Sequence, residues 1–450
     1  MSENTMLNVN ESGHLTIGGC DAVELARKHG TPLYVYDEER IRSRCREYIK
    51  QFSDRYPELE IAYAGKAALT TGIARLMDQE GMGLDVASAG ELYTALQADF
   101  PAERIKMHGN FKSNQEYRMA LEAGVGRIVV DSLLELKQLN CWARKMDQVA
   151  DILIRVRPGI DTHTHELIQT GQVDSKFGVG IYGGEAREAI ETAMAAESLN
   201  LHGLHCHIGS QLLETDAFER AIDQMISFLA QMHEELGLEC EDLDLGGGLG
   251  IRYTEHDEPP TVADLAEAIC PRLLAKLDEH GLNHPRLILE PGRSIVGEAG
   301  VTLYTVGVVK DIPDLRTYVS VDGGLSDNPR PALYDAEYEA VVANRASEEP
   351  SHWVRVAGKH CETDTLIDDT CLGECEPGDI LAVFSTGAYN YAMASNYNRF
   401  TRPAVVLCCD GEDNLLVERE SLSDLITHDR IPRHLEPREG CCGEGCCGQE

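Results

Sequence analysis

Residues 60–68 read Glu-Ile-Ala-Tyr-Ala-Gly-Lys-Ala-Ala, a short apolar run that ends in a lysine. The apolar residues up to Ala64 predict a buried strand, and Lys66 follows where that strand ends. Small neighbours on both sides leave room for a bulky ligand against the amine. A lysine enclosed by apolar residues can have its pKa lowered by desolvation, which makes it a usable nucleophile. On this segment alone, a lysine that caps the strand and reaches into water is an equal alternative.

The pattern of a strand followed by a helix repeats outward from this segment. Eight strand-like runs alternate with helical patterns, and such a series over about 250 residues predicts an α/β fold, a (β/α)8 TIM-like barrel. A doubly wound open sheet is the competing architecture. The eight runs end near Ala64, Val86, Met107, Val130, Val156, Cys206, Leu245 and Leu289.

Capping signals mark several helix ends. Ser113 with Glu116, and Ser132 with Glu135, each place a hydroxyl three residues before a carboxylate, which predicts two capping boxes. Gly124 and Gly237 stand where helices are expected to stop.

Near residue 300 the alternation gives way to short β-rich runs with turn residues between them. This change predicts a mostly β C-terminal domain at 296–432 after a barrel at 38–295. N-terminal strands at 1–37 are expected to pair with the β domain, and 433–450 to form a flexible Cys/Gly-rich tail. The four tail thiols, Cys441 to Cys447, could hold zinc or copper. Their spacing matches no zinc pattern, so we expect free thiols and no metal site.

Composition excludes several classes of partner. The chain carries 76 acidic and 40 basic residues, a net charge of −36. Nucleic acids and anionic membranes need a basic surface, so neither is an expected partner. Without an apolar run of about 18 residues or a secretory signal, the sequence predicts a cytoplasmic protein. The acidic excess indicates a well-solvated surface, with salt adaptation as the alternative. Eleven of the 15 cysteines are scattered, as expected of buried thiols.

Several unusual clusters follow predicted strands, at the edge where barrel active sites are built. Each has an ordinary reading, as turn glycines, core histidines or a surface carboxylate, but their coincidence at one edge favours a site. Successive glycines let backbone N–H groups converge on a phosphate, and Arg293 would complete the anion site. A nucleotide is disfavoured because neither the Walker nor the dinucleotide pattern is present. The clusters are Lys66, His108-Gly109-Asn110, residues 205–210, Gly246-Gly247-Gly248-Leu249-Gly250 and Glu290-Pro291-Gly292-Arg293.

A lysine nucleophile, a phosphate cradle, an aromatic-sized platform and a buried carboxylate together suit pyridoxal 5'-phosphate. Lys66 would hold its aldehyde as a Schiff base, and His207 could stack on the ring. Glu290 could pair with the ring nitrogen and keep it protonated, which strengthens the electron sink. An arginine there would favour simple proton transfer, so the carboxylate favours decarboxylation over racemisation.

Four motifs resemble the fold-type III pyridoxal-phosphate decarboxylases, whose barrel is of the alanine racemase type. They lie at 63–67, 207–211, 246–248 and 290–293. Three further stretches, at 163–178, 326–334 and 358–362, make the chain similar to the diaminopimelate decarboxylases across roughly residues 14 to 430. This resemblance implies a carboxy-lyase that converts meso-2,6-diaminopimelate to L-lysine and carbon dioxide, the last step of lysine biosynthesis.

The resemblance also implies roles for single residues. Lys66 would be the Schiff-base lysine and Cys361 the acid that protonates Cα. In this family Cys361 and Glu362 come from the partner subunit, which implies a two-fold homodimer with active sites at the interface. The cofactor would be bound by Lys66, His207, Ser210, Gly247, Gly248, Glu290, Gly292, Arg293 and Tyr389. The substrate would be bound by Arg293, Arg330, Tyr334, Glu362 and Tyr389.

Some alternatives remain. A related decarboxylase of ornithine, lysine, arginine or carboxynorspermidine is the nearest, although Arg330 and Tyr334 argue against ornithine and lysine, which lack a distal carboxylate. A non-catalytic pyridoxal-phosphate carrier would be expected to lack Lys66 or Cys361. Cys361 itself has the alternative of a buried structural thiol. Ala68, and residues 363–365 in place of the usual Ser-Gly-Asp, depart from the family pattern and loosen the substrate assignment.

Overall fold

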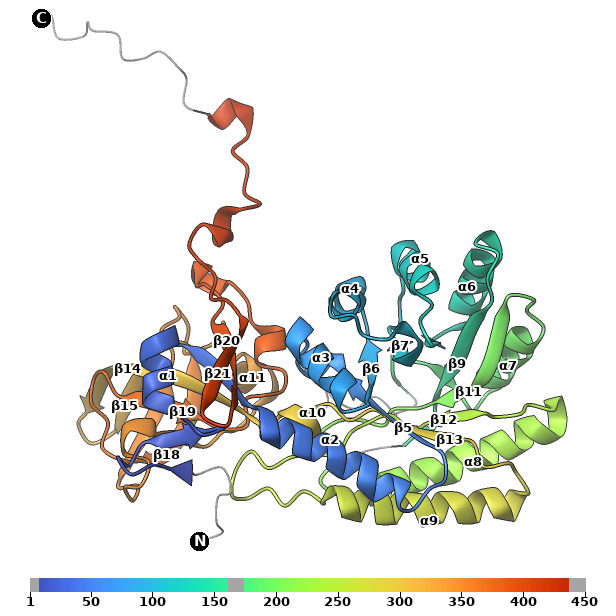
Figure 1. Ribbon diagram of the computed structural model, residues 1–450, viewed down its shortest axis with the longest axis horizontal. Coiled ribbons are helices and arrows are strands. Elements are labelled where there is room, and N and C mark those ends of the chain that lie inside the picture. Colours follow the sequence, from blue (N-terminus) through green and yellow to red (C-terminus); the bar gives the residue numbers. More distant parts are fainter. Residues whose placement is uncertain (1–7, 161–173, 437–450) are drawn as a thin grey trace, which may run out of the picture.

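The computed structural model describes residues 8–160 and 174–436. Two lobes lie along the long axis of the molecule, one a barrel of strands and helices and the other built mainly of strands (Figure 1). The described residues after β21 (Glu412–Val417), up to residue 436, extend away from both lobes (Figure 1). The tail thiols and residues 163–173 of the family motif lie outside the described residues.

Eight parallel strands form the first lobe. They are hydrogen-bonded in the order β9-β11-β12-β13-β5-β6-β7-β8, and β8 pairs back onto β9 through Val130 and Ile154. The predicted barrel is therefore confirmed, and the open doubly wound sheet is wrong because this sheet has no free edge. The short strand β10 (Val179–Gly180) adds a further parallel pair on β9. The barrel strands are β5 Leu59–Ala64, β6 Gly83–Val86, β7 Ile105–Met107, β8 Arg127–Val130, β9 Ala150–Arg157, β11 Leu199–His205, β12 Asp242–Asp244 and β13 Arg286–Leu289.

Helices cover the outside of the barrel, and their ends follow the expected capping chemistry. Ser113 and Glu116 form the predicted capping box, and Gly124 and Gly237 end their helices in the left-handed conformation. At the other predicted box Ser132 caps the Glu135 N–H, but the Glu135 carboxylate accepts from the Asp131 N–H and from Lys112 instead. The helices are α2 Glu38–Ser53, α3 Thr71–Gln79, α4 Ala89–Gln97, α5 Asn114–Ala123, α6 Leu133–Lys145, α7 Glu185–Met194, α8 Asp216–Leu236 and α9 Val262–His280.

The second lobe is a mixed sheet with the order β18-β17-β15-β14-β4-β20-β21, and β19 pairs with both β14 and β16. The predicted mostly β lobe is confirmed, while β16 and β18 were not expected from the sequence. A separate three-stranded sheet holds β1 Asn8–Val9, β2 Leu15–Ile17 and β3 Cys20–Asp21, and α1 Ala22–His29 follows it. The strands of the large sheet are β4 Leu33–Asp37, β14 Gly300–Ile312, β15 Arg316–Val321, β16 Ala340–Val342, β17 His352–Ala357, β18 Thr365–Leu372, β19 Ile380–Val383, β20 Ala404–Cys409 and β21.

The strand β4 joins the two lobes. Successive side chains of a strand point to opposite faces, and here Leu33 and Val35 pack in the core of the β lobe while Tyr34 and Tyr36 pack in the barrel core. The Tyr36 hydroxyl donates to the Gly387 carbonyl oxygen at 2.7 Å. This fixes the loop that follows β19 against the mouth of the barrel.

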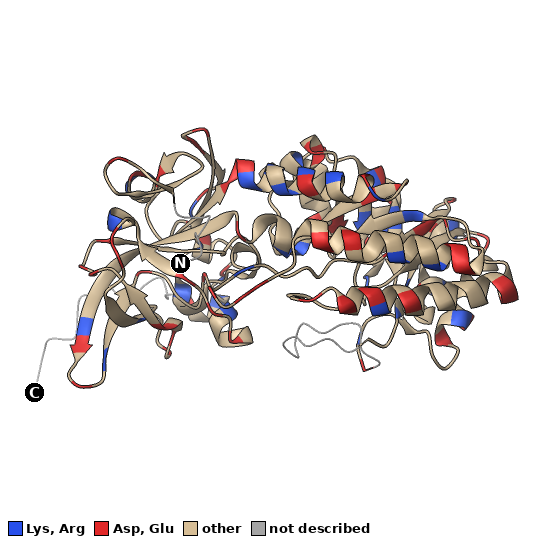
Figure 2. Ribbon diagram, turned by 90° about the horizontal axis from the view of Figure 1, so that it is seen from below, with Lys and Arg blue, Asp and Glu red and all other residues tan. Residues whose placement is uncertain are grey.

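Charged residues cover the outer helices with both signs interspersed (Figure 2). Within residues 8–160 and 174–436, we find no helix that is both long and apolar enough to cross a lipid bilayer.

Candidate active site

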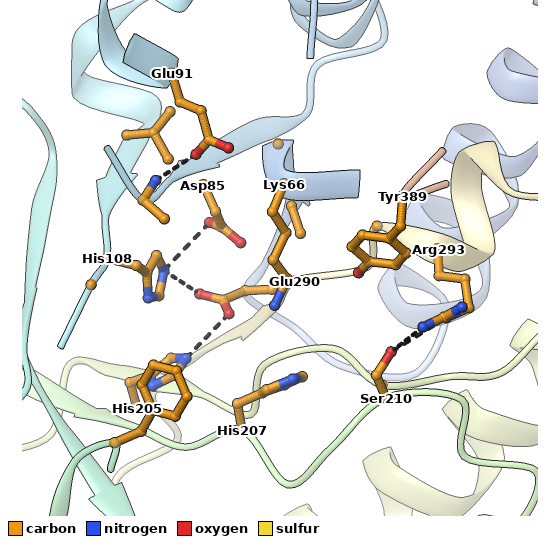
Figure 3. A pocket seen from close by; sticks show the side chains of 18 of the residues that line it. Lys66, Asp85, Glu91, His108, His205, His207, Ser210, Glu290, Arg293 and Tyr389 are labelled. Atoms are coloured by element: carbon orange, nitrogen blue, oxygen red, sulfur yellow. Dashed lines mark hydrogen bonds and ion pairs between the residues drawn. The ribbon is translucent and has the colours of Figure 1, made fainter. Parts of the chain in front are cut away.

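A pocket of about 190 Å³ lies at the carboxyl ends of the barrel strands. Its walls come from both lobes, because Tyr389 reaches in from the loop after β19 (Figure 3). Most residues predicted to bind the cofactor meet here. The predicted residues that line it are Lys66, His207, Ser210, Gly248, Glu290, Gly292, Arg293 and Tyr389.

Lys66 lies in the short helix η1 (Gly65–Ala67), directly after β5. The turn is tight, because a Cβ on Gly65 would lie 2.8 Å from the Asp85 carbonyl oxygen. Its flanking residues Gly65 and Ala67 are buried, while the Lys66 side chain extends into the pocket toward Glu290 (Figure 3). Lys66 is itself exposed, but its side chain lines the pocket, and this placement favours the nucleophile over a lysine that only caps the strand.

Glu290 follows β13 and projects into the centre of the barrel, where two histidines hold it (Figure 3). The Nε2 atom of His108 lies 2.8 Å from Glu290 Oε1, and the Nε2 atom of His205 lies 3.2 Å from Glu290 Oε2. The carboxylate is buried with 9% of the residue exposed. A buried carboxylate with this support can accept a hydrogen bond from a protonated ring nitrogen.

These contacts determine the charge states of the cluster. Burial opposes ionisation of Glu290, yet the charges of His108 and His205 and their hydrogen bonds lower its pKa well below the ordinary value. Burial also opposes the charged form of His108, but Glu290 and Asp85 raise its pKa to about 9. Burial lowers the pKa of His205 to about 4. At neutral pH the cluster therefore holds an ionised carboxylate, a charged His108 and a neutral His205.

Glycines make room on the opposite side of the pocket. A Cβ on Gly248 would lie 2.7 Å from the Gly209 carbonyl oxygen, and one on Gly292 would lie 2.9 Å from Ala64 Cβ. Gly248 also has a φ of +132°, which side chains rarely adopt. Beside them Arg293 Nη2 donates to Ser210 Oγ at 3.0 Å. A guanidinium, a hydroxyl and backbone free of side chains fit the phosphate of pyridoxal 5'-phosphate.

Two other predicted cofactor residues, His207 and Gly247, contact each other at the pocket. His207 lies on the pocket floor between His205 and Ser210 (Figure 3). Burial and the charge of Lys66 lower the pKa of His207 well below its ordinary value, so the ring is neutral and suited to stacking. Its Nδ1 accepts from the Gly247 N–H at 3.3 Å. Gly247 is therefore beside the pocket, but it does not line it.

The predicted substrate residues of α11 (Arg330–Tyr334) are not part of the pocket lining. Arg330 is buried, and its Nη1 donates to the Tyr338 hydroxyl at 2.7 Å. Its guanidinium also lies 4.8 Å from the centre of the Tyr253 ring, and the Tyr253 hydroxyl accepts from Arg293 Nη1 at 2.5 Å. Arg330 and Arg293 are thus joined through Tyr253. Neither Arg330 nor Tyr334 lines the pocket.

Cys361 and Glu362 are not brought into the pocket of their own chain. They lie on an exposed loop after β17, and Cys361 is not the buried structural thiol of the alternative interpretation. The Cys361 N–H donates to Asn398 Oδ1 at 3.2 Å, and the Tyr397 hydroxyl donates to Glu362.

Several lining residues had no role in the sequence-based prediction. His108 and His205 were recognised only as clusters after strands, and Asp85, Glu91 and Arg155 were not singled out. Asp85 and Arg155 lie near the carboxyl ends of β6 and β9. Because barrel active sites are built at these strand ends, both residues could have been identified in the same way as Lys66. Glu91 was hidden because it belongs to α4, where its Oε2 accepts from the Ala87 N–H at 2.6 Å.

Known proteins of one family are similar to this chain over most of its length. Residues 38–297 match the model of the pyridoxal-binding domain of pyridoxal-dependent decarboxylases. The chain is 48% identical to diaminopimelate decarboxylase of Bacillus subtilis, an alignment that covers 93% of this chain and 96% of that one. It is 45% identical to the diaminopimelate decarboxylase of Staphylococcus aureus over 93% of this chain and 98% of that protein.

Solved structures of the same family are also similar to this chain. Diaminopimelate decarboxylase from M. jannaschii in complex with L-lysine superposes with a TM-score of 0.90 and 39% identity, covering 96% of this chain and 99% of that one. The Helicobacter pylori diaminopimelate decarboxylase, also in complex with L-lysine, has a TM-score of 0.83 and 34% identity over 90% of this chain and 98% of that one.

Proposed function

The chain belongs to the diaminopimelate decarboxylase family of pyridoxal-dependent decarboxylases, and from this premise we propose how its residues convert meso-2,6-diaminopimelate to L-lysine and carbon dioxide. This reaction is the last step of lysine biosynthesis. Pyridoxal 5'-phosphate is the cofactor of the family. The observation that carries the proposal is the pocket in which Lys66, Glu290 and Arg293 meet at the carboxyl edge of the barrel.

Each side of the pocket has one task toward the cofactor. When bound, the cofactor supplies an electron sink for the charge left on Cα as the carboxyl group departs. The Lys66 amine would link to the aldehyde carbon, and Glu290 would accept a hydrogen bond from the ring nitrogen. The His207 ring would pack on one face. Gly247 would support this wall through its N–H, while Ser210, Gly248, Gly292, Arg293 and Tyr389 would surround the phosphate.

The far end of the substrate would be bound by residues of the second lobe. Arg330 offers a planar guanidinium suited to a carboxylate, and Tyr334 lies on the same short helix. Arg293 and Tyr389 would contact the substrate from the phosphate side. Glu362 would pair with the distal ammonium. A substrate without the distal carboxylate would lack this charge pairing with Arg330, which would weigh against it.

Cys361 would be the acid that protonates Cα after carbon dioxide leaves. In its own chain Cys361 lies outside the pocket, on an exposed loop. We therefore propose a two-fold homodimer in which Cys361 and Glu362 of one subunit complete the pocket of the other.

We further propose the division into a barrel at 38–295, a β domain at 296–432 with the N-terminal strands of 1–37, and a tail at 433–450. The place of β4 in the large sheet supports it. All cysteines among the described residues are free, which suits a reducing compartment such as the cytoplasm.

Product analysis tests the function most directly. Purified protein with pyridoxal 5'-phosphate is supplied in parallel with meso-diaminopimelate, ornithine and lysine, and carbon dioxide and amine products are measured. We expect turnover of meso-diaminopimelate to exceed that of the other two by about 10⁴-fold, because a site that pairs polar groups of its substrate rejects analogues that lack them. Equal turnover of all three would contradict the roles of Arg330 and Glu362.

A further inference from the structure

The contacts around Glu290 indicate how this carboxylate is oriented and kept ionised for the cofactor. His108 follows β7, His205 ends β11, and Glu290 follows β13. In the barrel β7 and β11 lie on opposite sides of β13, three and two strands away respectively. The two histidines therefore come from different strands of the barrel, and each contacts a different oxygen of the carboxylate (Figure 3).

The rings of the two histidines also contact each other. Their ring centres lie 5.1 Å apart in an edge-to-face arrangement with an angle of 64°. A carboxylate oxygen can only accept, so His205 Nε2 must carry a proton to hydrogen-bond Glu290, whereas His108 Nε2 is close enough to form an ion pair with the other oxygen. A neutral and a charged histidine could contact Glu290 in the same geometry, but only the charged one would also stabilise the negative charge of the carboxylate.

The surroundings show which histidine carries the charge. Asp85 Oδ1 lies 3.8 Å from His108 Nε2, so His108 faces two carboxylates. His205 is 1% exposed, and the positive charges of His108 and Arg155 oppose a charge on its ring. The titratable or charged groups that act on the cluster from the packed elements are Asp85, Lys106, Arg155, His207, Asp244 and Lys66.

We propose that His108 and His205 are positioning residues that hold the Glu290 carboxylate as an oriented anion and, through it, keep the ring nitrogen of the cofactor protonated. His108 supplies positive charge beside one carboxylate oxygen, and His205 supplies a neutral hydrogen bond to the other. This inference rests on the proposed function. It adds an outer layer of residues whose contribution reaches the reaction only through Glu290.

The different charges of the two histidines predict different responses to glutamine. Glutamine donates a neutral hydrogen bond, so His205→Gln retains the essential contact. His108→Gln loses the charge, and we expect kcat to fall about 10- to 100-fold, as for other residues that orient a ligand of a reactive centre. His202→Gln is the matched control, because His202 lies on the same strand β11 but pairs with Asp151 and Glu241 away from the pocket.

The protonation of the ring nitrogen is measured directly, without turnover. Each variant is loaded with pyridoxal 5'-phosphate that carries ¹⁵N in the ring, and the ¹⁵N chemical shift is followed between pH 6 and 9. We expect the shift of a protonated nitrogen in the wild type, His202→Gln and His205→Gln. We expect the shift to move toward the unprotonated value in His108→Gln, as in Glu290→Gln.

A double-mutant cycle separates positioning from general structural support. If His108 acts through Glu290, His108→Gln has little further effect on the ¹⁵N shift or kcat in the Glu290→Gln background. Additive losses would overturn the proposal, and so would a His108→Gln protein whose ring nitrogen remains fully protonated. If wild-type protein fails to bind the cofactor or to decarboxylate, the proposed function fails instead, so the two failures are distinguishable.

A measurement on the wild type covers the case in which His108→Gln does not fold. In the cofactor-loaded protein with ¹⁵N-labelled histidine, one buried ring should remain charged at pH 8 and another should stay neutral at pH 6. Absence of the charged ring would overturn the proposal. The ligand atoms of His108, His205 and Glu290 also lie within 4.8 Å of one another, a spacing suited to a metal ion. One equivalent of bound metal in the purified, active protein would likewise overturn the proposal.

Discussion

The cluster around Glu290 and the loop of Cys361 contrast sharply, although both are assigned to the same reaction. Glu290 is buried, its two oxygens have separate partners, and every member of the cluster comes from a strand end of one barrel. Cys361 is exposed on a loop of the β lobe, and its backbone N–H is held by Asn398.

The contrast suggests a division of labour. Apart from Tyr389, the residues assigned to the cofactor come from the barrel, and all of them belong to one chain. The residues assigned to the substrate's far end and to protonation belong to the β lobe, and Cys361 and Glu362 lie where a second chain could use them. Cofactor binding and turnover should therefore respond differently to substitutions in the two regions.

Substitution of Lys66 should have the largest effect. We expect Lys66→Ala to abolish the visible absorbance of the lysine-linked cofactor and to reduce turnover below detection, because the covalent attachment point is lost. Absorbance spectroscopy and a carbon dioxide assay measure both. Lys50→Ala, which removes an exposed lysine paired with Asp54, is the control and should change neither. A variant at Lys66 that keeps the absorbance would refute the assignment.

Cys361 should separate turnover from cofactor binding. Loss of a general acid should lower kcat by about 10²- to 10⁴-fold, while the absorbance of the bound cofactor should not change. Cys371→Ala is a matched control, since Cys371 lies on β18 of the same lobe. Equal loss of cofactor and activity would show a structural thiol instead.

Mixing two inactive variants tests whether the loop serves a partner. In a dimer with shared sites, a Lys66→Ala chain and a Cys361→Ala chain together rebuild one intact pocket. Random mixing should therefore restore about a quarter of the wild-type activity. Native mass spectrometry would confirm that subunits have exchanged. If activity is not recovered after exchange, the Cys361 loop either acts in the site of its own chain or takes no part in the reaction.

The charged state of His108 should appear as a pH dependence of stability. Its pKa is about 9 in the fold, above the ordinary value of 6.5, so the stabilisation is complete below pH 6.5 and is lost as the pH rises toward 9. Between pH 6.5 and 8 we expect the free energy of unfolding to fall by about 2 kcal/mol. Urea titrations at both pH values measure it, and His108→Gln should flatten this fall. An equally steep fall in that variant would assign it to other groups.

The smallest effect is expected at the exposed loop. Tyr397→Phe removes the hydroxyl that donates to Glu362. A solvent-exposed contact of this kind contributes little to stability, so unfolding in urea should hardly change and cofactor absorbance not at all. A rise in KM confined to meso-diaminopimelate would support the place of Glu362 in substrate binding. A stability loss as large as that expected from the buried cluster would remove the contrast between the two regions.

The barrel was predictable because its signals are local and repeated. Every strand end expected from the apolar runs lies within one residue of the observed end, from Ala64 to Leu289. The missed strands have weak local patterns. β18 carries Asp368 and Asp369 in its middle, and β16 has only three residues, so both depend on pairing with neighbours rather than on their own composition.

The sequence predicted at which edge of the barrel the site lies, but it did not predict the contacts between the side chains there. The rule that strand ends meet brought Lys66, His207 and Glu290 together without any knowledge of distances. It could not show that His108 and His205 share one carboxylate, since that depends on strands two and three places apart in the barrel. Nor could it show the link from Arg330 to Arg293 through Tyr253, which is a matter of packing between lobes.

The position of β4 has a consequence for the order in which the molecule can assemble. Leu33 pairs with Leu303 of β14 on one side and with Ala404 of β20 on the other. On a ribosome adding about 5 to 20 residues per second, β20 emerges on the order of 20 to 70 s after β4. Throughout that interval the apolar strand next to the barrel has an unsatisfied edge. The nascent chain therefore passes through a long stage in which β4 lacks a partner on at least one edge, the stage at which a chaperone would have most to protect.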